Sequence, residues 1–120
     1  MNILIAEDDD MIQTLMEICM SILEWDYILV ENGLQAVNTC KTNVFDAILM
    51  DLKMPVLDGI GAAKQIRVFN KETPIIAVSS HVDSLTTIEC ALAGINAFMA
   101  KPFTEDEIRD AVSKVVVLDS

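Results

Sequence analysis

The sequence predicts an α/β fold: a three-layer (βα)5 sandwich in which helices cover both faces of a doubly wound, parallel five-stranded sheet. Short apolar runs alternate five times with segments of helical periodicity. The runs are apolar almost throughout, which is typical of parallel strands that are buried on both faces. No repeat, low-complexity tract or linker interrupts this pattern, so we expect a single domain over residues 1–120.

The five predicted strands are residues 2–6, 27–30, 47–50, 75–78 and 97–100. After each strand comes a side chain with an acceptor oxygen, followed by a run with helical spacing, which is how helices usually begin. In three cases a Gln or Glu three residues later completes a capping box. The predicted boxes are Asp10 with Gln13, Asn32 with Gln35 and Thr104 with Glu107, and the predicted caps of the other two helices are Asp58 and Ser84.

The first helix is predicted to carry two apolar stripes. The core-facing stripe is Ile12, Met16, Cys19 and Leu23, and the stripe beside it is Met11, Leu15, Ile18 and Ile22. A second apolar stripe indicates either a surface that docks a partner or a helix that is deeply buried. Both interpretations stay open at this point.

The composition excludes several classes of partner. The net charge is −11, from 19 acidic and 8 basic residues, which argues against direct binding to nucleic acid or to an anionic membrane. The chain shows no signal peptide, and its most apolar stretch, residues 11–23, is too short to span a bilayer. Cys19, Cys40 and Cys90 form no C-x-x-C motif and are predicted to be buried free thiols. We therefore expect a cytoplasmic protein.

Charged and hydroxyl side chains follow four of the predicted strands. They are Glu7 and Asp8, Asp51, Ser79 and Lys101. Because ligands bind beyond the carboxyl ends of the strands in open parallel sheets, these groups are expected to converge. Three carboxylates against one ammonium leave a deficit of two positive charges, and oxygen ligands favour Mg²⁺. The sequence thus predicts a magnesium site.

Asp51 is the candidate nucleophile of this site. With a cation in place its carboxylate stays ionised and can attack phosphorus, as in aspartyl-phosphate enzymes. Lys101 would offset charge on the phosphoryl oxygens, and Ser79 would donate a hydrogen bond to them. A single Asp at a strand end is more often a cap or a turn residue. The joint placement of these groups is what favours phosphoryl transfer.

Four stretches, ILIAEDD, MDLKMPVLDG, PIIAVSS and FMAKPF, resemble the receiver domain of two-component response regulators. The similarity covers essentially the whole chain, and the motif spacings are intact. It implies a flavodoxin-like fold with strand order 2-1-3-4-5. It also implies a phosphorylatable signalling domain and not a separate enzyme, because such a domain catalyses only its own phosphorylation and dephosphorylation.

The resemblance implies a role for each matching position of the site. Asp51 matches the phosphoacceptor and Lys101 the lysine beside it. Asp8 and Asp51 match side chains that bind Mg²⁺ directly. Glu7 matches an acidic partner that acts through water, and the backbone carbonyl of Lys53 matches a third protein ligand.

The resemblance also implies a switch. Ser79 and Phe98 occupy its hydroxyl and aromatic positions, where Thr and Tyr are commoner. Lys53 and His81 occupy positions that tune how long the phosphoryl group lasts. The Lys101–Pro102 bond matches a peptide bond that is cis in the family.

Partners follow from the same resemblance. It implies a sensor histidine kinase or a histidine phosphotransfer protein as phosphodonor, which docks near the first helix. Phosphorylation would shift the surface of the fourth helix, fifth strand and fifth helix and so control a downstream protein or output domain. That surface would also support a phosphorylation-dependent homodimer. We expect no output domain within these residues.

Other functions fit parts of the pattern. A haloacid-dehalogenase-type phosphatase also uses a strand-end Asp, Mg²⁺, Ser or Thr and Lys, but it needs a second Asp where this chain has Lys53. A receiver-like interaction module that is never phosphorylated is the remaining alternative, although the intact acidic set argues against it. Nucleotide binding is not indicated, since the chain has neither G-x-G-x-x-G nor a P-loop.

Overall fold

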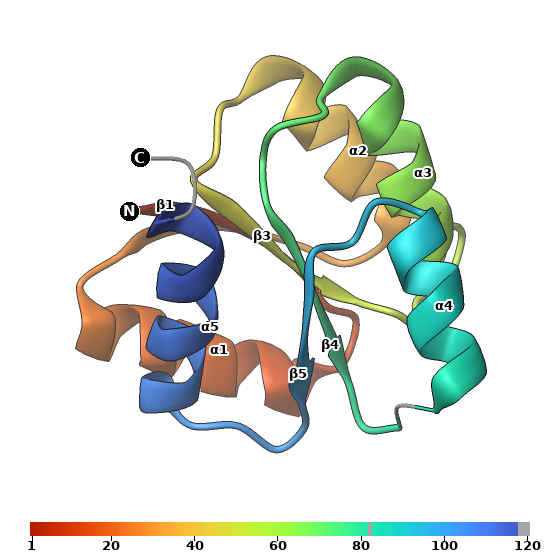
Figure 1. Cartoon of the computed structure of the whole chain (residues 1–120). Coiled ribbons are helices and arrows are strands. Elements are labelled where there is room, and N and C mark those ends of the chain that lie inside the picture. Colours follow the sequence, from red (N-terminus) through yellow and green to blue (C-terminus); the bar gives the residue numbers. More distant parts are fainter. Residues whose placement is uncertain (82, 118–120) are drawn as a thin grey trace.

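The computed structural model describes residues 1–81 and 83–117, and strands and helices alternate along them as expected (Figure 1). The elements are β1 (Asn2–Ala6), α1 (Asp10–Leu23), β2 (Asp26–Val30), α2 (Gly33–Thr42), β3 (Ala47–Asp51), α3 (Gly59–Phe69), β4 (Ile75–Ser79), α4 (Ser84–Leu92), β5 (Ala97–Ala100) and α5 (Glu105–Val117).

The five strands form one parallel sheet in the order β2-β1-β3-β4-β5, so the flavodoxin-like order is confirmed. The predicted bounds are right to within one residue. β2 begins earlier, at Asp26, while β3 and β4 end later, at Asp51 and Ser79. The extra residues stay paired, because Asp51 lies opposite Val78 and Ser79 opposite Ala100.

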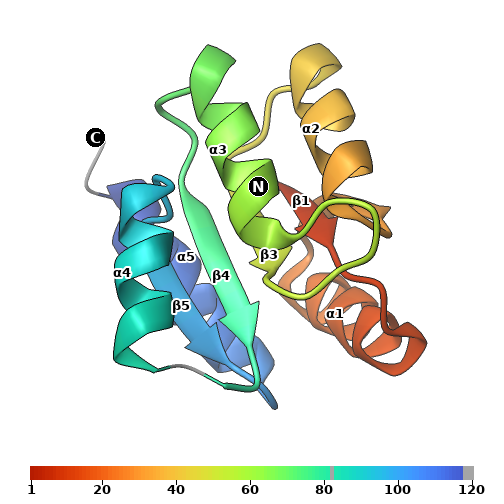
Figure 2. The same ribbon diagram turned by 90° about the vertical axis from the view of Figure 1, so that its right-hand side faces the viewer.

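The helices form two layers. Buried side chains of α1 and α5 pack on one face of the sheet, and those of α2, α3 and α4 pack on the other. Figure 1 shows α1 and α5 side by side, and Figure 2 looks onto the layer of α2, α3 and α4. β1, β3 and β4 are enclosed from both sides and almost wholly buried, whereas the edge strand β2 alternates between exposed and covered residues. Alternation in β2 departs from the expectation because only one of its faces is well covered: Tyr27 and Leu29 pack against the layer of α1 and α5, and the residues that alternate with them, Asp26 and Ile28, are exposed.

Three predicted helix starts are confirmed. Asn32 caps α2 by accepting a hydrogen bond from the Gln35 N–H at 2.8 Å, and Asp58 caps α3. The predicted box of Asn32 with Gln35 is incomplete, because the Gln35 side chain accepts from the Glu31 N–H and not from that of Asn32. Thr104 and Glu107 form the reciprocal capping box, with each side chain bonded to the other's backbone N–H at 3.2 Å.

Two predicted caps are wrong by one residue. The cap of α1 is Asp9, not Asp10, and its Oδ1 accepts from the Met11 N–H at 2.9 Å. The cap of α4 is Asp83, not Ser84. In both cases two neighbouring residues are good caps by type, and the one with extended backbone takes the role.

The second apolar stripe of α1 is largely on the surface. Met11 is 82% exposed, Ile18 51% and Ile22 57%, while Leu15 is half-buried. Buried residues of α1 are Met16, Cys19 and Met20. The interpretation of α1 as a deeply buried helix is therefore wrong.

Other expectations concern the cysteines, the membrane and one peptide bond. Cys19, Cys40 and Cys90 are free and buried, as predicted. Among the described residues, no helix combines the length and the apolar character needed to cross a bilayer. The Lys101–Pro102 bond has the cis form that the resemblance implies.

The loop between β3 and α3 makes a tight turn at Val56. The Leu57 N–H donates to the Pro55 carbonyl at 2.7 Å, which closes a γ-turn with Val56 at its centre. Val56 has φ +69°, a conformation that is strained for a β-branched residue. The turn brings the Leu57 carbonyl to the start of α2, where it accepts from the Gly33 N–H at 2.9 Å. A Cβ at Gly33 would lie 2.2 Å from that oxygen, so only glycine allows this approach.

We predict that Val56→Gly raises the free energy of unfolding by about 1 kcal/mol, because relief of backbone strain exceeds the entropy cost of glycine. Urea or thermal unfolding measures it. Val44→Gly is the matched control, since Val44 is also exposed but has no positive φ, and it should lower stability. Equal destabilisation by both substitutions would show that Val56 stores no strain.

Candidate functional site

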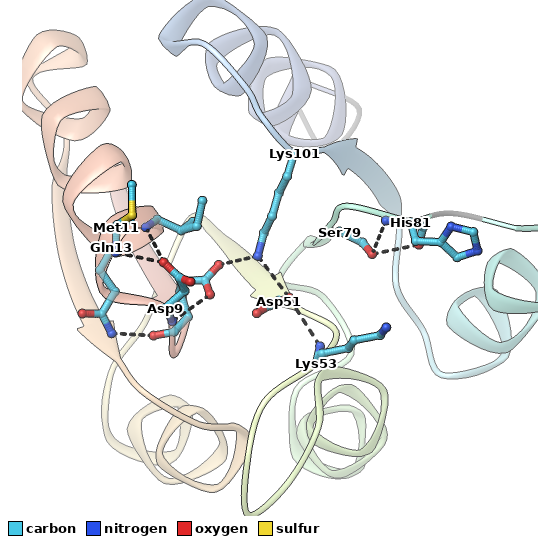
Figure 3. A network of polar contacts seen from close by, with 10 residues as sticks. Asp9, Met11, Gln13, Asp51, Lys53, Ser79, His81 and Lys101 are labelled. Carbon is cyan, nitrogen blue, oxygen red and sulfur yellow. Dashed lines mark hydrogen bonds and ion pairs between the residues drawn. The ribbon is translucent and has the colours of Figure 1, made fainter.

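The sequence-predicted groups gather in one pocket beyond the carboxyl ends of the strands. Asp51 is the last residue of β3 and Ser79 the last of β4, while Glu7 and Lys101 come directly after β1 and β5. The pocket has a volume of about 570 Å³ and is lined by Glu7, Asp8, Asp9, Asp10, Ile12, Asp51, Lys53, Ser79, Ser80 and Lys101. Figure 3 shows Lys101 extending towards Asp51 across this edge of the sheet.

Lys101 links two of the carboxylates. Its Nζ lies 2.8 Å from Oε1 of Glu7 and 3.4 Å from Oδ1 of Asp51. All three side chains are largely shielded from water, with exposed fractions of 15% for Lys101, 0% for Glu7 and 8% for Asp51. These ion pairs therefore act at low local dielectric and hold three strand ends together.

Burial raises the pKa of Glu7 from 4.5 to about 7. The Lys101 ammonium and the Asp9 N–H, which donates to Oε2 at 3.1 Å, oppose this rise, and the nearby Asp51 adds to it. For Lys101, burial alone lowers the pKa, but the contacts with Glu7 and Asp51 outweigh burial and the pKa lies above its ordinary value. The site thus keeps a charged ammonium beside a carboxyl that protonates near neutrality.

The carboxylates fit a hard divalent cation. One oxygen each from Glu7, Asp8 and Asp51 lies within 4.8 Å of the others. Oε1 of Glu7 is buried and, among the described residues, has no donor aligned for a hydrogen bond, although the Lys101 ammonium is close. Three carboxylates against one ammonium leave the pocket short of positive charge. Oxygen donors with this charge are the set that suits Mg²⁺.

Ser79 and Lys53 reach this edge in different ways. The Ser79 hydroxyl donates to the His81 carbonyl at 2.9 Å and accepts from the His81 N–H at 3.2 Å, so its own loop holds it (Figure 3). Lys53 contacts Asp51 through its backbone N–H, which donates to Oδ1 at 3.3 Å, and its side chain is exposed. The His81 ring lies on the surface, 3.5 Å from Oδ2 of Asp83.

Phe98 lies away from the carboxylates. It is half-buried on β5, where it packs against the core layer of α2, α3 and α4. It also lines a pocket of about 340 Å³ along β5 and α5, together with charged residues that include Glu107 and Lys114.

The roles of two residues beside the site escaped the sequence analysis. Gln13 is not the partner of a capping box: its Nε2 donates to the Glu7 carbonyl at 2.6 Å, and nothing in its spacing distinguishes it from Gln35. Gly59 lies so close to β3 that a Cβ would be 2.2 Å from the Asp51 carbonyl oxygen. Gly59 is the last residue of the stretch MDLKMPVLDG, and a glycine at that place in the sequence could have indicated this close approach.

Comparison with known proteins agrees with the fold. The family model described as "Response regulator receiver domain" matches residues 3–113. The chain is 33% identical over 116 residues to "Transcription factor SKN7" of Candida albicans. The matched region covers 94% of this chain but only 20% of that protein. The chain thus spans about a fifth of the length of this relative.

Two solved structures superpose closely. The first is the receiver domain of sensor histidine kinase PA1611 from Pseudomonas aeruginosa PAO1, which has a magnesium ion coordinated in its active site cleft; its TM-score is 0.90, with 35% identity and 97% of each chain covered. The second is a co-crystal structure from Saccharomyces cerevisiae of the histidine phosphotransfer signalling protein Ypd1 and the receiver domain of its response regulator Ssk1. Its TM-score is 0.90, with 29% identity and coverage of 99% of this chain and 90% of that one.

The raised pKa of Glu7 predicts how stability depends on pH without metal ions. The folded state holds this proton more firmly than the unfolded state does, so the stabilisation is complete below pH 4.5 and is lost as the pH rises to about 7. The loss amounts to about 3 kcal/mol. Chemical denaturation of the wild type and Glu7→Gln across this range measures it, and the variant should become the more stable protein above pH 7.

Glu89→Gln is the control, because Glu89 is an exposed glutamate on α4. Its pH profile should match the wild type. Parallel profiles for wild type and Glu7→Gln would show that Glu7 does not titrate in this way.

Proposed function

The chain belongs to the response regulator receiver family, and from that premise we propose that it is a phosphoacceptor switch over residues 1–120. Asp51 accepts a phosphoryl group from a histidine, and the surface formed by α4, β5 and α5 changes in response. The position of Asp51 carries this proposal: it is the buried end of β3, 3.4 Å from the Lys101 ammonium in an acidic pocket.

In the proposed reaction a carboxylate oxygen of Asp51 attacks the phosphorus of a phosphohistidine. The new oxygen–phosphorus bond forms as the phosphorus–nitrogen bond breaks, and the imidazole leaves with the electron pair of that bond. The Lys101 ammonium faces the developing charge on the phosphoryl oxygens, because it already lies between Asp51 and Glu7. Burial of Asp51 limits the water that can reach the product acyl phosphate.

Glu7, Asp8, Asp51 and the backbone carbonyl of Lys53 are the proposed holders of Mg²⁺. The acidic cluster and the buried Oε1 of Glu7 support this assignment. When bound, the ion would neutralise charge on the carboxylates and on the transferred group.

Ser79 and Phe98 are the proposed switch. The Ser79 hydroxyl is bonded to the His81 backbone, so it must exchange those bonds for a phosphoryl oxygen. Phe98 is half-buried and would turn further inward as Ser79 moves away. This shift in population between two states would alter the surface of α4, β5 and α5 without changing the fold.

Lys53 and His81 are the proposed tuning residues. Both side chains are exposed. Lys53 lines the pocket, and His81 follows Ser80 in the loop after β4. From there they would shield the acyl phosphate from water or pair with it. Neither makes a direct side-chain contact with Asp51 among the hydrogen bonds and ion pairs of the described residues.

The proposed partners are a sensor histidine kinase or a histidine phosphotransfer protein in the cytoplasm, and a downstream protein or output domain. The exposed stripe Met11, Ile18 and Ile22 on α1 supports docking of the phosphodonor beside the site. The surface of α4, β5 and α5 would contact the downstream partner or a second copy in a phosphorylation-dependent homodimer. The net charge of −11 supports the absence of direct contact with nucleic acid or membranes.

Intact mass after incubation with Mg²⁺ and acetyl phosphate tests the phosphoacceptor. We expect one added phosphoryl group in the wild type and none in Asp51→Asn, because the amide is a poor nucleophile. Asp9→Asn is the matched control. Asp9 lines the same pocket, but its Oδ1 caps α1, a role that Asn also fills, so uptake should persist.

Uptake that persists in Asp51→Asn would place the phosphoryl group elsewhere. Absence of both uptake and Mg²⁺ binding in the wild type would favour the receiver-like interaction module that is never phosphorylated.

We predict that Ile18→Glu slows phosphoryl transfer from the cognate kinase at least tenfold, since a charge in an apolar contact costs more than 1.4 kcal/mol. Uptake from acetyl phosphate should be unchanged. Ile88→Glu on α4 is the matched control, because Ile88 is exposed to 57% and Ile18 to 51%. Equal slowing with both phosphodonors would count against docking at α1.

A further inference from the structure

Two glutamines near helix starts look equivalent in the sequence but play different parts in the structure. Gln35 is local: its Oε1 accepts from the Glu31 N–H at 2.7 Å, just ahead of α2. Gln13 uses its donor end instead, and its Nε2 reaches back six residues to the Glu7 carbonyl at 2.6 Å. Figure 3 shows the Gln13 side chain directed from α1 towards the turn that carries Asp9.

This hydrogen bond completes the attachment of Glu7 to its surroundings. The Glu7 N–H donates to the Val30 carbonyl at 3.0 Å, so its backbone is bonded on both sides. Its side-chain Oε2 accepts from the Asp9 N–H at 3.1 Å. The Gln13 N–H in turn donates to the Asp9 carbonyl at 2.8 Å. The Gln13 side chain therefore holds the Glu7 end of the turn, while its backbone N–H makes the first helical bond of α1 to the Asp9 end.

The turn needs such a restraint because of its charge. Glu7 and Asp8 are consecutive, and each places a carboxylate oxygen within 4.8 Å of an oxygen of Asp51. Without a cation these carboxylates repel one another, and a turn free to move would separate them. Holding the backbone of Glu7 keeps the carboxylates together before a cation arrives, so less of the binding energy is lost to ordering.

We propose that Gln13 is a positioning residue for the cation site: its carboxamide fixes the β1–α1 turn so that Glu7 and Asp8 stay beside Asp51. This inference rests on the proposed function, because it assumes that the acidic pocket binds Mg²⁺. Some groups do not bind the metal but hold its ligands in place by hydrogen bonds. Removing such a group typically lowers metal affinity 10-fold to 100-fold. We expect about a 10-fold loss for Gln13.

The test compares Gln13→Met with Gln35→Met, which remove the carboxamide and keep side-chain length at two helix starts. Mg²⁺ binding is measured by calorimetry, and the backbone amide of Asp9 is followed by ¹⁵N NMR without metal. Gln13→Met should bind Mg²⁺ about 10-fold more weakly and shift the Asp9 amide resonance. Gln35→Met should leave both unchanged. At saturating Mg²⁺, Gln13→Met should recover the wild-type rate of uptake from acetyl phosphate.

The outcomes separate this inference from the proposed function. Wild-type protein that binds no Mg²⁺ would overturn the proposed cation site and this inference with it. Wild-type binding with unchanged affinity in Gln13→Met would overturn only the role of Gln13. An equal loss of affinity in Gln35→Met would also overturn it, because a general effect of helix starts would then explain the result.

Discussion

The contact of Lys101 with Glu7 and Asp51 is the interaction on which the site depends. These residues are far apart in the sequence, and each stands at the carboxyl end of a different strand. One ammonium therefore joins the ends of β5, β1 and β3 in a place largely shielded from water. Removing it would leave buried carboxylates uncompensated, which is much more costly than losing a surface ion pair. One ammonium still faces three carboxylates, so the pocket lacks positive charge. That deficit suits the pocket to a cation.

The rest of the edge is built around that cluster by short backbone contacts. Gly59 lets the start of α3 lie against the Asp51 carbonyl, and the strained turn at Val56 carries the loop to α2. On the other side, Gln13 and Asp9 bind the turn after β1 to α1. Each restraint comes from the first turn of a helix or the loop before it. A rigid sheet thus supplies the strand ends, and the helix starts set the direction in which their side chains lie.

The hydroxyl of Ser79 connects this edge with the surface of α4. It is held by the His81 backbone, and two residues further on Asp83 caps α4. A group that draws Ser79 towards Asp51 would therefore have to break these bonds to the His81 backbone. α4 is a short helix of nine residues with three large apolar side chains on its surface, Leu85, Ile88 and Leu92. A change at its start would alter how that apolar surface is presented to a partner.

The sequence by itself determined the strands to within one residue, the layered parallel fold and the gathering of Glu7, Asp8, Asp51, Ser79 and Lys101 at one edge. Those features follow from local apolar runs and from the rule that parallel strands share a carboxyl edge. Only the tertiary structure decided between Asp9 and Asp10 as the cap, between donor and acceptor roles for Gln13 and Gln35, and between burial and exposure of the second stripe on α1. In each of these cases the competing residues have the same local chemistry. The cap depends on which of two neighbours adopts an extended backbone, and the glutamine roles depend on which backbone group the fold brings within reach. The exposure of the stripe depends on which face of α1 packs on the sheet. Residue spacing does not contain that information.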